Sequence, residues 1–380
     1  MLIKPVVLFI DDDSFMLKAL LRAAMRLHPD WHYHLSDDAA HWQKALPEGV
    51  VPDLIVSDFL MPDLQGDVVL SQAMSKMPEA VRVLMTGDTS EDVVSSVSLQ
   101  SHFVLSKPFS EKDLTQLFDC IVRLRQLQLP LQLRQQLGQA GNVPVLPAII
   151  RNLRQELTAE SPAIERVVDI IAHEPMIAAR LMQLANSAFL GYSRATLSLS
   201  ESLLRLGLRL VESIVTLMAV EQQVAHLRDS HDHFQLSDLA FRQAGTAKSL
   251  AKAVQLSTEQ QDLLFMSALL SALGPLSKLQ LNAQIGIAVP DQLNGINSDH
   301  VLTVYLLILW GYPAEVCQLA LQQHVPGQGP DVADYRPFIL AITQQYYQGC
   351  SQQYLHQMAQ LVPHPGLQQA LRQLPELDRP

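Results

Sequence analysis

The sequence predicts an α/β domain built on a doubly wound parallel sheet, followed by an all-helical domain. Short apolar runs alternate with amphipathic stretches over residues 1–127, a pattern typical of a parallel sheet covered by helices on both faces. Glycines and prolines interrupt this pattern over residues 128–147, which indicates a linker. Only helical periodicity follows over residues 148–375, so we expect the second domain to be all-α.

Acidic side chains follow two of the predicted strands. The apolar run at residues 6–10 ends in Asp11 and Asp12, and the run at residues 54–57 ends in Asp58. Open α/β sheets bind ligands and carry out their chemistry at the carboxyl ends of their strands. We therefore expect these carboxylates to meet at one edge of the sheet.

A hydroxyl and an ammonium group follow the next two predicted strands, as Thr86 and Lys107. Clustered carboxylates raise each other's pKa unless a cation joins them, and Mg²⁺ prefers oxygen ligands of this kind. The metal and Lys107 would neutralise charge, and Thr86 would donate a hydrogen bond. Such a site is suited to hold a phosphoryl group on Asp58, since phosphoryl transfer depends mainly on positioning and electrostatics.

This set of motifs resembles the receiver domain of bacterial two-component response regulators, over about the first third of the chain. The resemblance implies a flavodoxin-like fold. It also implies that Asp58 takes a phosphoryl group from a sensor histidine kinase or a phosphotransfer protein. The implied Mg²⁺ ligands are Asp11, Asp12, Asp58 and the backbone carbonyl of Leu60. Taken alone, Asp12 also suits the N-cap of a helix.

The resemblance further implies that Thr86 and Lys107 sense the phosphate. The family usually places an aromatic residue three positions before this lysine, where it follows the threonine inward as a switch. Here that position is Val104, and the nearest aromatic residue, Phe103, lies one position earlier. The chain therefore departs from the family at the threonine–aromatic relay.

Three segments of the second domain carry another resemblance, at residues 169–181, 184–189 and 203–207. They look like the HDOD domain, a helical relative of the HD phosphohydrolases. A catalytic HD domain needs several His and Asp side chains around one or two metal ions. The matching positions here are Gln243, Ser271 and Ala272, and no late Asp occurs near residues 339–343. The resemblance therefore implies a fold retained as a binding surface.

Several histidines remain to be assigned in the helical domain. His231 and His233 flank Asp232 in what we interpret as a polar stretch between helices, where metal binding is the less favoured role. His300 and His324 are interpreted as core or cap histidines in preference to relics of an ancestral metal site. Asn186 suits a hydrogen-bonded buried amide better than a ligand contact.

Composition excludes several classes of protein. The net charge of −11 argues against a nucleic-acid binder, which relies on clustered Lys and Arg. The 3 cysteines are far apart and show no disulfide or zinc spacing. No signal peptide follows Met1, and the longest apolar run, around residues 304–310, is short of the roughly 20 residues that cross a bilayer. We therefore expect a cytoplasmic protein without a membrane partner.

The predicted function is that of a phosphorylation-controlled adaptor. Phosphorylation of Asp58 would change the receiver surface around residues 104–121, and the helical domain would then contact a downstream signalling protein differently. A further hypothesis is that this contact regulates another signalling enzyme, an active phosphodiesterase or a kinase. Coupling is expected through the helix that ends near Pro130, and a homodimer is compatible with the family. The alternative is an HD-type phosphodiesterase acting on a cyclic dinucleotide or nucleotide through an atypical metal site.

Overall fold

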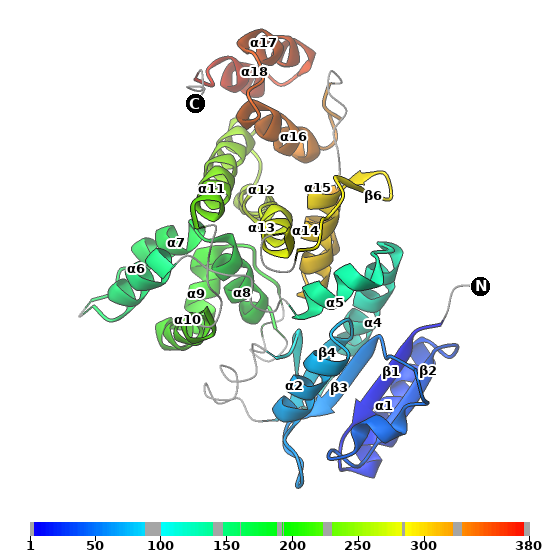
Figure 1. Cartoon of the computed structure of the whole chain (residues 1–380). Helices are drawn as coiled ribbons and strands as arrows, with labels where there is room; N and C mark the ends of the chain where they lie inside the picture. The colour runs from blue at the N-terminus through cyan, green and yellow to red at the C-terminus, as the bar shows by residue number, and fades with distance from the viewer. Residues whose placement is uncertain are drawn as a thin grey trace.

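The fold is known from a computed structural model, which describes residues 4–87, 100–139, 147–159, 161–187, 192, 194–222, 230–282, 286–321 and 329–375. A sheet with flanking helices forms the N-terminal part, and helices form nearly all of the rest (Figure 1). The predicted fold class is therefore confirmed.

The first domain contains one parallel five-stranded sheet in the order β2-β1-β3-β4-β5. The strands are β1 Val6–Ile10, β2 His32–Ser36, β3 Leu54–Asp58, β4 Val81–Thr86 and β5 Phe103–Ser106. Strands β1, β3 and β4 are buried throughout, as parallel strands covered on both faces should be. This order is the one found in flavodoxin-like folds.

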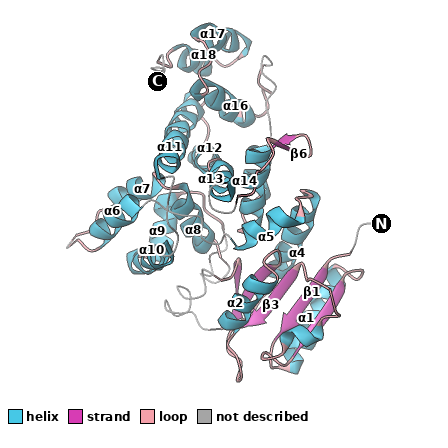
Figure 2. Cartoon of the chain, viewed as in Figure 1, coloured by secondary structure: helices cyan, strands magenta, loops and turns pink. Residues whose placement is uncertain are grey.

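Helices cover the sheet as Figure 2 shows. They are α1 Ser14–Leu27, the 3₁₀ turn η1 Trp42–Ala45, α2 Gly66–Lys76 and α4 Glu111–Gln126. Helix α1 lies beside α4. At the start of α4, the side chain of Ser110 accepts a hydrogen bond from the Asp113 backbone, and the Asp113 carboxylate accepts one from the Ser110 backbone. This capping box, together with Asp113 and Glu111 in the first turn, fixes where α4 begins.

The predicted linker contains a helix, α5 Leu131–Gln139, that packs against α2. Leu133 and Leu137 are buried, and Arg82 of β4 donates a hydrogen bond of 3.0 Å to the carbonyl of Gly138. A Cβ at Gly138 would lie 1.8 Å from the carbonyl oxygen of Pro78, so only glycine permits this approach. Apolar burial and a buried guanidinium thus hold this part of the predicted linker in place.

The described part of the second domain is a set of packed helices with one two-stranded hairpin, β6 Gln292–Leu293 and β7 Ile296–Asn297. The helices are α6 Pro147–Leu157, α7 Ile164–Ala172, α8 Pro175–Ala185, α9 Leu199–Leu206, α10 Leu208–Gln222, α11 Ser230–Ala253, α12 Thr258–Leu270, α13 Leu273–Gln280, α14 Ser298–Leu309, α15 Ala314–Leu321, α16 Arg336–Tyr347, α17 Gln352–Leu361 and α18 Pro365–Arg372.

Helices α12 and α13 together form a stretch, Thr258–Gln280, that is long and apolar enough to cross a membrane by length and composition alone. The expectation that apolar runs are too short overlooked this stretch. Within the fold, however, 67% of its most apolar window is buried, which is the ordinary situation of a core helix. The hydropathy of this stretch therefore reflects burial among its neighbouring helices.

The two domains contact each other through the β5 and α4 side of the sheet. Helix α4 packs on α14, and Figure 1 shows α4 and α5 lying between the sheet and the helical domain. The Cys120 thiol of α4 donates a hydrogen bond of 3.3 Å to the carbonyl of Ile308 at the end of α14. Arg123 reaches the carbonyl of Tyr312 at 3.4 Å. The contact thus involves the face that the sequence singles out as the changing surface.

Candidate phosphoryl-acceptor site

The structure brings all of the predicted receiver residues to one edge of the sheet. Asp11 and Asp12 follow β1, Asp58 ends β3, Thr86 ends β4, and Lys107 follows β5. Since these four strands are parallel and adjacent, their carboxyl ends meet at the same edge. Strand direction and order therefore assemble a site whose members span about a hundred residues of sequence.

One potential ligand oxygen from each of Asp11, Asp12 and Asp58 lies within 4.8 Å of the others. Asp11 and Asp58 are buried, whereas Asp12 is exposed. Asp13, and not Asp12, caps helix α1 by accepting a hydrogen bond from the backbone of Phe15, so capping does not engage Asp12. Three convergent carboxylates match the all-oxygen donor set of Mg²⁺, so these residues fit that ion.

Lys107 connects two of the carboxylates. Its Nζ lies 2.7 Å from Oδ1 of Asp58 and 3.0 Å from Oδ2 of Asp11. Its backbone N–H donates a hydrogen bond of 2.8 Å to the carbonyl of Thr86, which holds the lysine beside β4. The ammonium group thus lies where charge on a modified Asp58 would develop.

The electrostatics of the site follow from burial. Burial raises the pKa of Asp58, and the hydrogen bond and charge of Lys107 only partly offset this effect. Burial also lowers the pKa of Lys107, but its hydrogen bonds to Asp58 and Asp11 outweigh this and leave the pKa above its ordinary value. The ionised Asp58 is therefore poorly solvated, which is a reason for it to gain from a bound cation.

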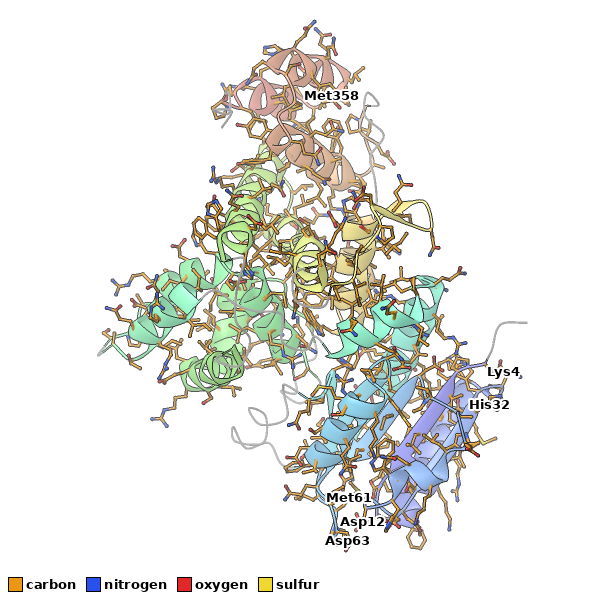
Figure 3. All side chains as sticks on the ribbon, in the orientation of Figure 1. Lys4, Asp12, His32, Met61, Asp63 and Met358 are labelled. Carbon is orange, nitrogen blue, oxygen red and sulfur yellow. The ribbon has the colours of Figure 1, made fainter. Side chains whose placement is uncertain are left out.

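The loop after Asp58 depends on a glycine that the sequence analysis missed. The backbone N–H of Gly66 donates a hydrogen bond of 3.0 Å to the carbonyl of Phe59, and a Cβ at Gly66 would lie 1.9 Å from the carbonyl oxygen of Asp58. Leu60 lies in this loop with an exposed side chain. Figure 3 places Asp12, Met61 and Asp63 together at this end of the domain.

Phe103 lies away from the carboxylate cluster and faces the helical domain. A Cβ at Gly311, in the turn after α14, would lie 2.5 Å from Cε1 of the Phe103 ring, so the ring packs directly against the glycine. Val104, in the usual switch position, is buried. Strand β5 therefore carries an aromatic side chain to the interdomain contact and is followed directly by Lys107.

A cavity of about 370 Å³ lies along this contact between the domains. Residues of β5 and α4 line one side, among them Val104 and Leu117, and Trp310 and Asn186 line the other. The amide of Asn186 donates a hydrogen bond of 2.8 Å to the Thr196 carbonyl and accepts one from its backbone N–H. The interpretation of Asn186 as a hydrogen-bonded amide is thus supported by these contacts.

Most of the predicted positions of lost HD ligands come together. Gln243 of α11, Ser271 after α12 and Thr343 of α16 line one cavity of about 400 Å³ together with His300 of α14, whereas Ala272 is buried outside that lining. His324 lies outside the described residues. The sequence comparison with HD domains therefore identified residues that share a site in the fold, although their side chains are not a metal-binding set.

The assignment of His231, Asp232 and His233 to a polar stretch between helices is wrong. All three belong to the first turn of α11. His233 is buried, and its Nε2 lies 3.1 Å from a carboxylate oxygen of Glu174, which is also buried. The error arose because the residues of this turn are mostly polar, which suggested a loop. One side of the turn nevertheless faces the core, and there His233 contacts Glu174 at the start of α8.

Two family models match the chain. The response regulator receiver domain matches residues 7–119, and the HDOD domain matches residues 143–326. The receiver match ends within α4, the HDOD match begins before α6, and helices α16 to α18 lie beyond the HDOD match.

Curated relatives match the receiver part. The nisin biosynthesis regulatory protein NisR of Lactococcus lactis subsp. lactis is 26% identical over 112 residues, or 28% of this chain and 46% of NisR. The probable transcriptional regulatory protein TcrX of Mycobacterium tuberculosis is 27% identical over 125 residues, or 33% of this chain and 50% of TcrX. The chain thus spans about half the length of the curated relatives it matches.

Solved structures resemble the chain as well. The signal receiver domain of an HD domain-containing protein from Pseudomonas fluorescens is 21% identical, with a TM-score of 0.30, and the match covers 33% of this chain and 94% of that one. The MmoQ response regulator from Methylococcus capsulatus is 16% identical, with a TM-score of 0.47, covering 60% of this chain and 98% of that one. With both family models matched, the chain joins an N-terminal response regulator receiver domain to a C-terminal HDOD domain.

Proposed function

We propose that Asp58 accepts a phosphoryl group from a sensor histidine kinase or a phosphotransfer protein, and that this controls how the HDOD domain is held against the receiver. The observation that carries the proposal is strand β5. Lys107, directly after this strand, contacts Asp58, and Phe103 at its start packs against Gly311 of the HDOD domain. The residue that contacts Asp58 and the residue that contacts the HDOD domain are thus four positions apart in the sequence.

In the phosphoryl transfer, the main contribution of the protein is to position the reacting groups. A carboxylate oxygen of Asp58 attacks the phosphorus as the bond from phosphorus to the donor histidine nitrogen breaks, and a proton on the other ring nitrogen lets the imidazole leave as a neutral group. Lys107 is placed to stabilise the charge on the phosphoryl oxygens. Mg²⁺, held by Asp11, Asp12, Asp58 and the carbonyl of Leu60, would supply further charge neutralisation. Thr86, buried at the end of β4, is the candidate hydrogen-bond donor.

Phosphorylation would alter the ion pairs that Lys107 makes. In the unmodified site the ammonium bridges Asp58 and Asp11. A phosphoryl group on Asp58 adds negative charge and oxygen acceptors, so Lys107 would move to satisfy them. Because Lys107 is continuous with β5, the strand would shift against the HDOD domain. The coupling proposed here therefore runs through β5 and α4, in place of the helix end near Pro130.

The HDOD domain would act by binding another signalling protein, without HD-type catalysis. Gln243, Ser271 and Thr343 occupy one cavity but offer amide and hydroxyl groups, which are weak ligands for the metals of HD enzymes. The proposed location is the cytoplasm, where sensor kinases present their phosphorylated histidines. The phosphodiesterase alternative predicts metal-dependent hydrolysis of a cyclic dinucleotide or nucleotide, which this proposal does not.

The test is covalent labelling of the full chain with acetyl phosphate and Mg²⁺, followed by mass spectrometry of peptides. We expect one phosphorylated carboxylate at Asp58, loss of labelling in Asp58→Asn, and normal labelling in Asp63→Asn, which changes an exposed carboxylate at the same end of the domain. Labelling that survives in Asp58→Asn would overturn the assignment.

Gating is tested separately by capturing partners from host lysate, with beryllium trifluoride and Mg²⁺ present or absent. We expect a specific partner to be retained in only one of the two states, and Asp58→Asn to remove the difference. Equal retention in both states would contradict gating while leaving the acceptor role of Asp58 intact.

A further inference from the structure

The cavity formed by Gln243, Ser271, His300 and Thr343 has chemical features that the proposed function does not use. Its volume of about 400 Å³ lies within the range of small-molecule sites. It opens between α11, α12, α14, α15 and α16 and is bordered by the β6–β7 hairpin, so five helices and a hairpin of the helical domain converge on it. It is separate from the acceptor site and from the cavity between the domains.

Two buried hydroxyl groups in the cavity lack partners among the described residues. Ser267 is 3% exposed and Thr343 is 1% exposed, yet neither hydroxyl has a hydrogen-bond partner. Other hydroxyls nearby are satisfied, since Ser271 donates to the carbonyl of Ala268 and Thr303 donates to that of Ser271. A buried hydroxyl without a partner costs about 1–3 kcal/mol, so this pair is suited to groups that a ligand supplies.

The described lining residues include no Asp, Glu, Lys or Arg. His300 is the only titratable residue among them, and burial lowers its pKa, so its ring is neutral at pH 7. A phosphate or carboxylate entering the cavity would lose its hydration without gaining a cation. The cavity therefore favours an uncharged ligand.

Amide side chains are the most common polar groups on the wall. Gln243, Gln292, Gln344 and Asn297 each carry a donor and an acceptor side by side. This pairing matches the edge of a nucleobase, as in the contacts that Asn and Gln make with adenine. Apolar side chains such as Leu319 and Leu340 are available for the faces of the ring.

We propose that this cavity binds an uncharged nucleoside or free nucleobase, with Ser267 and Thr343 as hydrogen-bonding partners. The inference goes beyond the proposed function, because it concerns a ligand of the HDOD domain and needs no phosphorylation. It also gives a role to the site where HD enzymes hold metal: the amides and hydroxyls that replace metal ligands are themselves suited to binding a polar, neutral molecule.

The test is calorimetric titration of the unphosphorylated full chain with adenosine, guanosine, cytidine and uridine, and with their 5′-monophosphates. We expect at least one nucleoside to bind and its 5′-monophosphate to bind at least about tenfold more weakly. Thr343→Val and Ser267→Ala should each weaken nucleoside binding about three- to tenfold. Thr158→Val removes an exposed hydroxyl away from the cavity and should leave binding unchanged.

Thermal unfolding separates lost binding from lost folding. Thr343→Val replaces an unsatisfied buried hydroxyl by a methyl group of similar shape, so the free variant should unfold at the wild-type temperature or above. Failure of all four nucleosides to bind, equal binding of a monophosphate, or wild-type affinity in both Thr343→Val and Ser267→Ala would each overturn the proposal. None of these results bears on Asp58.

Discussion

Replacing Gly311 by alanine is expected to weaken the contact between the two domains. Gly311 has a φ of +73°, and its added Cβ would lie 2.5 Å from Cε1 and 3.3 Å from Cδ1 of the Phe103 ring. The ring is part of β5, so it has little freedom to retreat within the receiver domain. The overlap is most easily relieved by moving the domains apart.

The size of the effect follows from two separate costs. Overpacking a well-packed contact costs about 1–3 kcal/mol, and the left-handed backbone costs a non-glycine residue about 1–2 kcal/mol. The backbone cost is the same in the docked and the separated state, so only the overpacking cost opposes docking. A penalty of 1–3 kcal/mol shifts the docking equilibrium by about 5- to 150-fold.

The thiol of Cys120 reports that equilibrium. It is 3% exposed at the contact with α14, and burial raises its pKa to about 12, so the reactive thiolate is scarce while the domains are docked. Separation exposes the thiol and returns its pKa toward the ordinary value. We therefore expect Gly311→Ala to speed the modification of Cys120 by about 5- to 150-fold, measured by mass spectrometry that locates the label.

Two further variants separate the overpacking cost from the backbone cost. Gly349 has a φ of +85° with nothing within 4 Å of an added Cβ, so Gly349→Ala carries the backbone cost alone and should leave the Cys120 rate unchanged. Adding Phe103→Ala to Gly311→Ala should remove the overlap and make the two changes non-additive. Equal rates for the Gly311 and Gly349 variants, or simple additivity with Phe103→Ala, would refute the account.

Two other predictions concern the receiver domain. Because burial raises the pKa of Asp58, the folded domain binds the proton more tightly than the unfolded chain, so the ionised carboxylate costs stability at pH 7. Asp58→Asn should therefore raise the melting temperature at pH 7, and this increase in melting temperature should shrink as pH falls toward about 4. Mg²⁺ should stabilise the wild type more than the variant. Arg82→Met should lower the free energy of unfolding by at least about 2 kcal/mol in urea titrations, because it strips the carbonyls of Pro78 and Gly138 of a buried donor. Exposed Arg22→Met is its control, and a similar loss there would contradict this reason.

The carboxylate and lysine cluster was predictable because its geometry depends on local features. Each of Asp11, Asp58, Thr86 and Lys107 follows or ends a predicted strand, and parallel strands bring such positions to one edge whatever the loops between them do. The same reasoning missed strand β2, whose polar and apolar residues mix because it lies at the edge of the sheet.

Contacts between distant segments were not predictable from local patterns. Gly311 and Phe103 meet only because two domains dock, and Gly138 is required only because α5 packs against the carbonyl of Pro78. Composition marked residues 128–147 as a linker, since glycine and proline are frequent there, but tertiary burial of Leu133 and Leu137 overrides that signal. For the same reason, local patterns did not predict that His233 faces the core.

The domain contact also buries like charges. Arg82 is 1% exposed. Burial lowers its pKa to about 10 against the opposing effect of Tyr305, and Arg180 of α8 contributes a smaller lowering, so Arg82 stays charged at pH 7. Burial and the same two cations hold the pKa of His102 well below its usual range, while the carbonyl of His102 accepts a hydrogen bond from Gln183. Like charges held in a buried contact oppose it and are relieved when the domains part. Apolar packing of Phe103 on Gly311 is thus set against electrostatic repulsion. Under the proposed coupling, a shift of β5 caused by a change at Lys107 would alter this balance.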